Sequence, residues 1–161
     1  MSDVRNCGVA ADTKVETPEG SMTIRVCAGK AIPVLSRNAE SAVLFRMMQD
    51  VRKVADVHPV LRITLENGDS FRVAPEQVLF QADMRPVAAS AIKPGTPLMP
   101  AFHYPPGYQF NTDGGDERVS DRALKVVRIE PAGTAEVYAL GVNQTGCFFL
   151  AAGVLCGAEK S

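Results

Sequence analysis

The sequence predicts an all-β domain. Its 13 glycines and 11 prolines interrupt the chain about every ten residues, and the short runs between them are rich in Val, Ile, Leu, Phe and Thr. Turn residues at that spacing, with β-branched and aromatic residues between them, are typical of short strands rather than helices. The 161 residues fit one domain, and the hydrophobic fraction of 46% excludes a disordered chain.

The first half of the chain alternates between extended runs and turns. A strand is predicted at residues 13–17, followed by a turn at 18–20. Residues 48–55 fit either an extended segment or a single turn of helix, and the sequence leaves both open. Other extended runs are predicted at residues 23–26, 31–37 and 42–48.

A β-hairpin is predicted in the middle of the chain, where residues 61–65 and 69–73 alternate between apolar and polar. Directly opposed residues share a face of an antiparallel pair, and a two-residue loop would bring a charged residue to the core face. A three-residue loop at 66–68 restores the match, with Gly68 in the positive-φ position of a bulge. The predicted pairs are Leu61 with Val73, Ile63 with Phe71, and Leu65 with Asp69.

The second half is predicted to contain further short strands around one irregular region. Residues 101–118 combine prolines, glycines and aromatic side chains and are too long for a tight connection. Aromatic residues on a proline-stiffened loop suit a protein partner, although the same side chains also suit packing against the domain itself. The strands are expected at residues 77–81, 85–88, 124–130, 135–142, 148–151 and 154–156, with a turn of helix at 91–95.

The charge and the residue inventory exclude several classes of function. Seventeen basic and 18 acidic residues give a net charge of -1, which argues against binding of nucleic acid or of a membrane through a basic surface. No apolar run approaches the ~20 residues of a membrane span. Residues 1–6 carry no signal-peptide core, so a cytoplasmic location is expected. The cysteines lack zinc-site spacing, and no metal, cofactor or disulfide framework is predicted. The cysteines are Cys7, Cys27, Cys147 and Cys156, and the histidines are His58 and His103.

Three segments carry motifs in a recognisable order. Residues 7–20 begin with a cysteine and continue through a Thr-x-Val strand to a Thr-Pro-x-Gly turn. Residues 65–79 contain Leu-x-x-Gly, then Val, Pro and Gln at fixed offsets, and residues 137–155 run from Val-Tyr-x-Leu-x-Val through Phe-Phe to Gly-Val-Leu. Together these segments resemble the sequence blocks of inteins and hedgehog-type autoprocessing domains, the Hint family, over residues 7 to about 157.

The resemblance implies a fold and a division of the chain. The expected fold is a horseshoe of mostly antiparallel strands, with two halves related by a pseudo-two-fold axis and with the chain termini close together. Residues 1–6 are then a short upstream segment, residues 7–157 the Hint-like domain, and residues 158–161 a tail.

The resemblance also implies self-directed peptide chemistry at Cys7, which would attack the carbonyl of Asn6 and exchange the peptide bond for a thioester. In the family, the middle block supplies a threonine hydroxyl and a histidine imidazole for this step. Here Ala74 and Gln77 occupy those positions. A glutamine amide cannot deliver a proton at neutral pH, and general acid–base help is typically worth 10²–10⁴-fold in rate. Neither histidine lies in the block, although the fold can bring either one near.

The C-terminal block departs further from the family pattern. Gly157 and Ala158 stand where splicing members have a His-Asn pair, and neither can cyclise, so splicing is expected to be lost. The prediction is a Hint domain with slow or absent cleavage at Cys7, acting at most on its own upstream segment and not as a turnover enzyme. The alternative is an inactive Hint-fold module for binding or structure. By the same resemblance, Cys156 is expected near Cys7, and a disulfide between them is a hypothesis.

Overall fold

The computed structural model describes residues 7–38, 42–100, 109–111, 117–119 and 124–160. The predicted scissile bond after Asn6, His103 and the proposed partner surface of residues 101–118, apart from two short strands, lie outside the described residues. Antiparallel strands dominate the described part, which confirms the all-β prediction. Among these residues no helix is long and apolar enough to cross a membrane.

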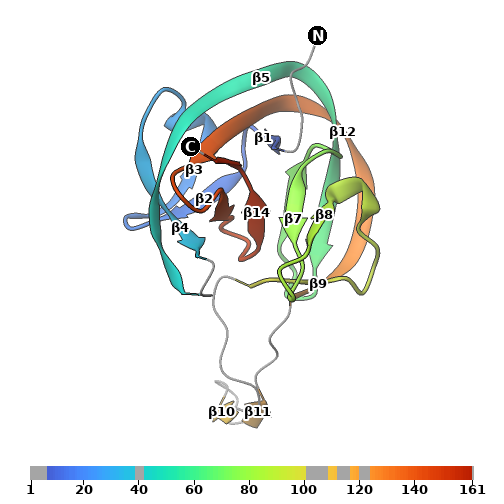
Figure 1. Ribbon diagram of the computed structural model, residues 1–161. Helices are drawn as coiled ribbons and strands as arrows, with labels where there is room; N and C mark the ends of the chain where they lie inside the picture. The colour runs from blue at the N-terminus through green and yellow to red at the C-terminus, as the bar shows by residue number, and fades with distance from the viewer. Residues whose placement is uncertain (1–6, 39–41, 101–108, 112–116, 120–123, 161) are drawn as a thin grey trace.

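Two long strands build the frame of the molecule. Strand β5 (Val43–Leu65) has 23 residues, β12 (Leu124–Val142) has 19, and they pair antiparallel along most of their length. Figure 1 shows them curving side by side around the shorter strands. A straight strand of β5's length would span about 75 Å. A compact chain of this size is roughly 40 Å across, so the strands have to bend.

Bulges provide that bend. Between the pairs Ala139 with Arg52 and Gly141 with Gln49, β5 carries one extra residue, and Asp50 there has a φ of 59°. Strand β12 has its own extra residue near Gly133, whose φ is 75°. An extra residue bends a strand and increases its twist without ending it.

The shorter strands attach to this frame in four sheets. The main sheet has the order β15-β12-β1-β6-β5-β4, with β9 also paired to β12. A second sheet has the order β13-β14-β7-β8, and β2–β3 and β10–β11 are separate hairpins. The remaining strands are β1 (Val9–Ala10), β2 (Lys14–Thr17), β3 (Gly20–Thr23), β4 (Ile32–Arg37), β6 (Ser70–Val73), β7 (Val78–Phe80), β8 (Pro86–Ala88), β9 (Pro97–Leu98), β10 (Gln109–Asn111), β11 (Glu117–Val119), β13 (Cys147–Phe149), β14 (Leu155–Gly157) and β15 (Glu159–Lys160).

The predicted central hairpin is confirmed. Leu61 pairs with Val73 and Ile63 with Phe71. The Leu65 N–H donates to the Asp69 carbonyl at 2.8 Å, which completes the predicted register. Gly68 in the three-residue loop has a φ of 93°.

Other predictions about single elements are wrong. Residues 23–26 are not an extended run: β3 ends at Thr23, and a 3-10 turn, η1 (Ile24–Cys27), follows. The reason is that the Ile24 and Arg25 N–H groups donate back to the carbonyls of Thr13 and Ala11. The short helical turn expected at 91–95 lies earlier, as η2 (Ala89–Ala91).

One open alternative is resolved, one predicted interruption is absent, and one unpredicted hairpin is present. Residues 48–55 are part of β5 and not a turn of helix, and residues 124–130 and 135–142 form one strand. Within the region predicted to be irregular, β10 and β11 pair antiparallel. The bulges explain both the ambiguity at residues 48–55 and the missed continuity of β12, because they disturb the apolar alternation without breaking the strand.

The two ends of the described chain meet on β12. Strand β1 pairs with β12 at Val9 and Tyr138, and β15 pairs with it in parallel at Glu159 and Gly141. Tyr138 and Gly141 are only three residues apart, which confirms that the chain ends lie close together. Residues 159–160 of the predicted tail thus form a sheet strand.

Candidate functional site

Cys7 lies just before β1, at the edge of the main apolar cluster, with only 3% of its surface exposed. Its Sγ is 3.8 Å from the carbonyl oxygen of Leu140, a long and weak hydrogen bond. Burial raises the pKa of the Cys7 thiol to about 11, because a thiolate there would lose most of its hydration. The sulfur is therefore held as a protonated thiol at neutral pH.

Gln77 joins the two chain ends through its buried side-chain amide. The residue follows β6 in a turn in which its N–H donates to the Ala74 carbonyl at 3.0 Å. Its Oε1 accepts the N–H of Gly8 at 2.7 Å, and its Nε2 donates to the carbonyl of Gly157 at 2.8 Å. The second Nε2 hydrogen points to the Val78 carbonyl at 2.7 Å, so both amide hydrogens have partners.

Ala74 stands beside the same residues. Its N–H donates to the carbonyl of Gly8 at 2.9 Å, so Gly8 is bonded on both sides by the turn that carries Gln77. The Ala74 methyl group is fully buried in an apolar cluster with Val60 and Val137. The structure thus brings Ala74 and Gln77 into contact with Gly8, the residue that follows Cys7.

Cys156 lies on β14, opposite Leu79 of β7, and is fully buried. Its pKa is raised well above the ordinary value, first by burial and then by the charges of Cys7 and Cys147. All four cysteines are free thiols. The disulfide between Cys7 and Cys156 stays a hypothesis.

Gly157, next along β14, permits a close approach of two strands. A Cβ at this position would be 3.1 Å from the Cβ of Val78, closer than ordinary van der Waals contact. The glycine therefore lets β14 lie against β7, which places its carbonyl on the Gln77 amide.

An ion pair next to Cys7 has no local signal in the sequence. Arg52 on β5 and Glu159 on β15 are joined at 2.8 Å, with both side chains partly exposed. The Glu159 carboxylate raises the pKa of Cys7 and the Arg52 guanidinium lowers it. Only the register of β5 and β15 on β12 brings these residues together, so sequence reasoning missed them.

His58 comes to the predicted block but not to the cysteine. It is buried on β5, and its Nε2 is 3.1 Å from Oε1 of Glu76, the residue before Gln77. In the described part, no hydrogen bond joins His58 to Cys7 or Gln77. Over the same residues there is also no group of three or more His, Cys, Asp or Glu side chains placed to hold a metal ion.

Comparison with known proteins identifies the fold. No family model matches the sequence, and no curated protein matches it. Solved structures do match: a DnaB intein from Synechocystis sp. has a TM-score of 0.72 at 11% identity, covering 94% of this chain and 98% of that one. An intein-like domain from Clostridium thermocellum has a TM-score of 0.73 at 15% identity, covering 95% and 99%. A DnaX mini-intein from Spirulina platensis has a TM-score of 0.70 at 14% identity, covering 94% and 99%.

These likenesses cover nearly all of each chain, so they define a fold and not a shared motif. The chain has the intein-type Hint fold. At such identities the comparison establishes the fold alone, and the chemistry has to be argued from the residues of this chain.

Proposed function

We propose that this chain is an intein- and hedgehog-like Hint domain related to protein autoprocessing, with splicing lost and first-step cleavage at Cys7 slow or absent. The observation that carries the proposal is the side-chain amide of Gln77. It hydrogen-bonds both Gly8, next to the candidate nucleophile, and Gly157, near the C-terminal end. These contacts support a shared buried site for the candidate nucleophile, the middle block and the final strand.

The proposed reaction takes place on the chain's own upstream segment. The Cys7 sulfur attacks the carbonyl carbon of Asn6, the bond from that carbon to the Cys7 nitrogen breaks, and the thiol proton ends on the freed amine. The product is a thioester of the upstream segment on Cys7. An external thiol or hydroxylamine then takes the acyl group and returns Cys7 to a free thiol.

Three features of the site support a slow first step. With a pKa of about 11, on the order of one Cys7 in 10⁴ is a thiolate at pH 7. No imidazole stands at position 77 to protonate the leaving nitrogen. Both amide hydrogens of Gln77 are already bound to the carbonyls of Val78 and Gly157, so neither is available to polarise the scissile carbonyl.

The residues of the C-terminal block support the loss of splicing. Gly157 and Ala158 stand where a cyclising asparagine would be needed. Residues 1–6 serve as the upstream segment, 7–157 as the Hint domain and 158–161 as the tail, in a cytoplasmic protein. Residues 101–118 are proposed as a surface for a protein partner.

An inactive module for binding or structure is the second candidate, and the environment of Cys7 favours it. A thiol that is buried, protonated and hydrogen-bonded to Leu140 also fits a packing residue of the core. The two candidates differ in one observable, the release of an upstream peptide.

A reporter fused ahead of residue 1 tests the proposal. The fusion is incubated with dithiothreitol or hydroxylamine, and slow release of the reporter is expected that Cys7→Ala abolishes and the control Cys27→Ala retains. The double variant Gln77→His with Ala74→Thr should accelerate release by about 10²–10⁴-fold.

Each outcome decides between the readings. Release that persists in Cys7→Ala would refute Cys7 as the nucleophile. Complete cleavage of the wild type during expression would refute the argument that the block is degenerate. No release over days from either the wild type or the double variant would leave only the inactive module.

A further inference from the structure

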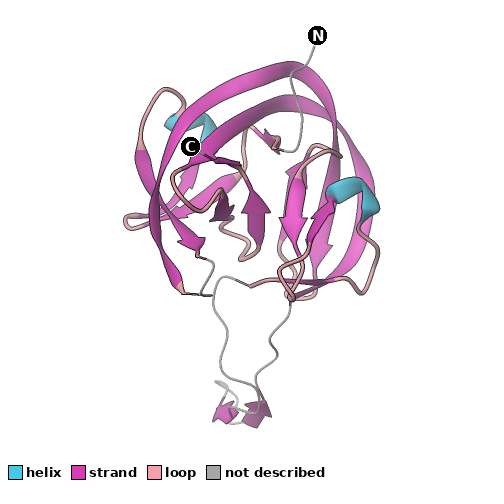
Figure 2. Ribbon diagram, viewed as in Figure 1, coloured by secondary structure: helices cyan, strands magenta, loops and turns pink. Residues whose placement is uncertain are grey.

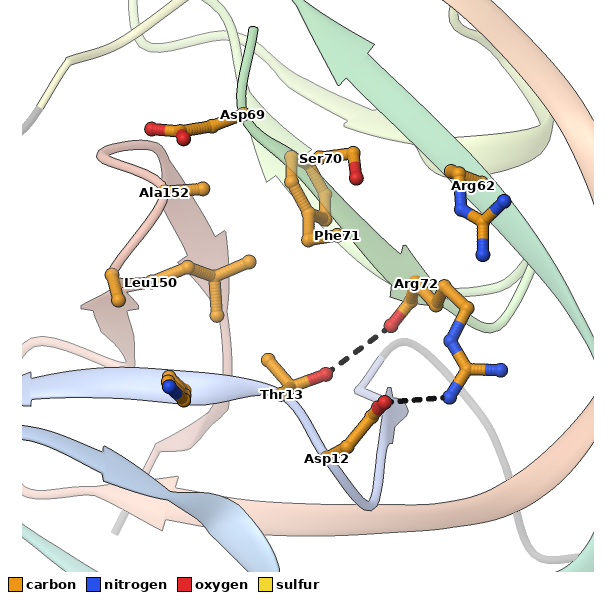
Figure 3. A pocket seen from close by; sticks show the side chains of 11 residues that line it. Asp12, Thr13, Arg62, Asp69, Ser70, Phe71, Arg72, Leu150 and Ala152 are labelled. Atoms are coloured by element: carbon orange, nitrogen blue, oxygen red, sulfur yellow. Dashed lines mark hydrogen bonds and ion pairs between the residues drawn. The ribbon is translucent and has the colours of Figure 1, made fainter.

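A polar cavity of about 400 Å³ lies outside the cysteine site. It is formed by the start of β2, by β6, and by the turn that follows β13 (Figure 3). None of Cys7, Ala74, Gln77 and Cys156 lines it. The lining residues that carry the argument are Asp12, Lys14, Arg62, Asp69, Ser70 and Arg72.

Two arginines stand directly opposite each other at this cavity. Arg62 on β5 pairs in register with Arg72 on β6, which places two like charges on one face of the sheet. Like charges directly opposite each other across a strand pair destabilise the sheet unless counter-charges are present. Arg72 has one: its Nη2 is 2.8 Å from Oδ2 of Asp12, as drawn in Figure 3.

Arg62 has no such partner. Within the described ranges no carboxylate lies within ion-pair distance of its guanidinium, and the residue is exposed. Glu130 faces it from β12 in the strand register, but the ion pair of Glu130 is with Arg128 at 4.0 Å. A guanidinium without an ion-pair partner, directly opposite a second guanidinium, is an arrangement that an anion stabilises.

The other lining groups are compatible with an anion. Lys14 adds a third cation, against the two carboxylates of Asp12 and Asp69. Figure 3 places Asp69 at the opposite end of the cavity from the two guanidinium groups. The hydroxyl of Ser70 faces the same cavity, and no hydrogen bond occupies it within the described residues. The volume falls in the range of small-molecule sites.

We propose that this cavity binds a small ligand through an oxyanion group, a phosphate or a carboxylate, held between Arg62 and Arg72. Guanidinium groups present paired N–H donors whose spacing matches the oxygens of both groups. Asp12 balances only one of the two guanidinium charges, and the bound anion would neutralise the positive charge that remains. This site is independent of any reaction at Cys7.

The test is a titration of the full chain with inorganic phosphate, pyrophosphate and citrate, followed by backbone amide NMR. Saturable shifts are expected at Thr13, Ser70 and Ala151, which line the cavity. Sodium chloride at matched ionic strength should not reproduce them. Tighter binding of the phosphates than of citrate would identify a phosphate ligand, and the reverse order a carboxylate.

Variants decide whether Arg62 carries the binding. Arg62→Gln should weaken binding by about tenfold or more, the magnitude of one lost charged hydrogen bond. Arg85→Gln, which removes the same charge from an exposed position in the turn between β7 and β8, should change it less than twofold. Asp12→Asn frees the Arg72 guanidinium and should strengthen binding, and this variant carries the test if Arg62→Gln does not fold. The proposal is overturned if chloride gives the same shifts, if Arg62→Gln binds like the wild type, or if Asp12→Asn binds no more tightly.

Discussion

Replacing Gln77 with methionine removes the amide that joins the two chain ends while keeping a side chain of similar length. The change leaves the Gly8 N–H and the carbonyls of Gly157 and Val78 without their partner at 2.7–2.8 Å. Residue 77 is fully buried, so water does not replace the lost bonds without opening the site. Each buried group left unsatisfied costs about 1–3 kcal/mol.

Three such groups predict a loss of about 3–9 kcal/mol in the free energy of unfolding, a large part of the 5–15 kcal/mol typical of a domain. Equilibrium urea denaturation followed by circular dichroism measures it. With a slope of about 2 kcal/mol per molar urea, the midpoint should fall by at least about 1.5 M. Hydrogen exchange at the Gly8 amide should also accelerate, because that amide loses its acceptor.

The matched control is Gln81→Met, which makes the same chemical change at a half-buried glutamine. In the described part of the chain, no hydrogen bond involves the Gln81 side chain, so this variant should cost less than about 1 kcal/mol. A Gln77→Met variant that loses less than about 1 kcal/mol, or no more than the control, would refute the assignment of Gln77 as the link between the ends.

Three further predictions follow from single contacts. The folded pKa of Cys7 is raised from 9.0 to about 11, so the stability it contributes is present below pH 9 and lost as pH rises through 11. Denaturation series should therefore show wild type losing about 3 kcal/mol relative to Cys7→Ala over that range, and parallel curves would contradict the burial argument. Glu159→Gln should lower the pKa of Cys7 and Arg52→Gln should raise it, as read from the pH dependence of Cys7 alkylation; shifts of the same sign would be inconsistent with the ion pair. Gly68→Ala should cost about 1–2 kcal/mol in urea titrations and Gly68→Asn less, since φ is 93° and the space for a Cβ is open; equal costs would rule out backbone strain as the cause.

The sequence was sufficient for the central hairpin because its register is fixed by parity within 13 residues. An alternation of apolar residues on both strands leaves only one loop length that keeps charge off the core. The observed pairing of Ile63 with Phe71 and the φ of Gly68 follow from that local constraint. No information from the rest of the chain was needed.

The continuity of the two long strands could not be predicted in the same way, because bulges produce residue spacings that also fit a helix or a turn. Met48 and Val51 are both buried and three residues apart, a spacing that indicates a helix as readily as a strand. The extra residue near Asp50 produces this spacing in a continuous strand. On β12, Pro131 and Gly133 look like a turn in the sequence, whereas the structure uses that segment as a bend in one strand.

Some residues of the candidate site could be predicted from the sequence, and others could not. Cys7, Ala74 and Gln77 were predicted from the resemblance of ordered sequence blocks to the Hint family. The ion pair of Arg52 and Glu159 depends on where two distant strands register on β12, and no local pattern encodes it.

The double variant proposed to restore cleavage should also be less stable than the wild type. Histidine at position 77 has two ring nitrogens and cannot replace all three hydrogen bonds of the glutamine amide. Threonine at position 74 puts a hydroxyl into the apolar cluster of Val60 and Val137, which costs about 1–3 kcal/mol unless it finds a partner. The side chain at position 77 holds the chain ends together through its hydrogen bonds, and the same position is the one that would have to serve cleavage at Cys7. Gln77→His with Ala74→Thr should gain cleavage rate while losing several kcal/mol in urea denaturation. A variant that gains rate at unchanged stability would show that the glutamine is not what closes the site.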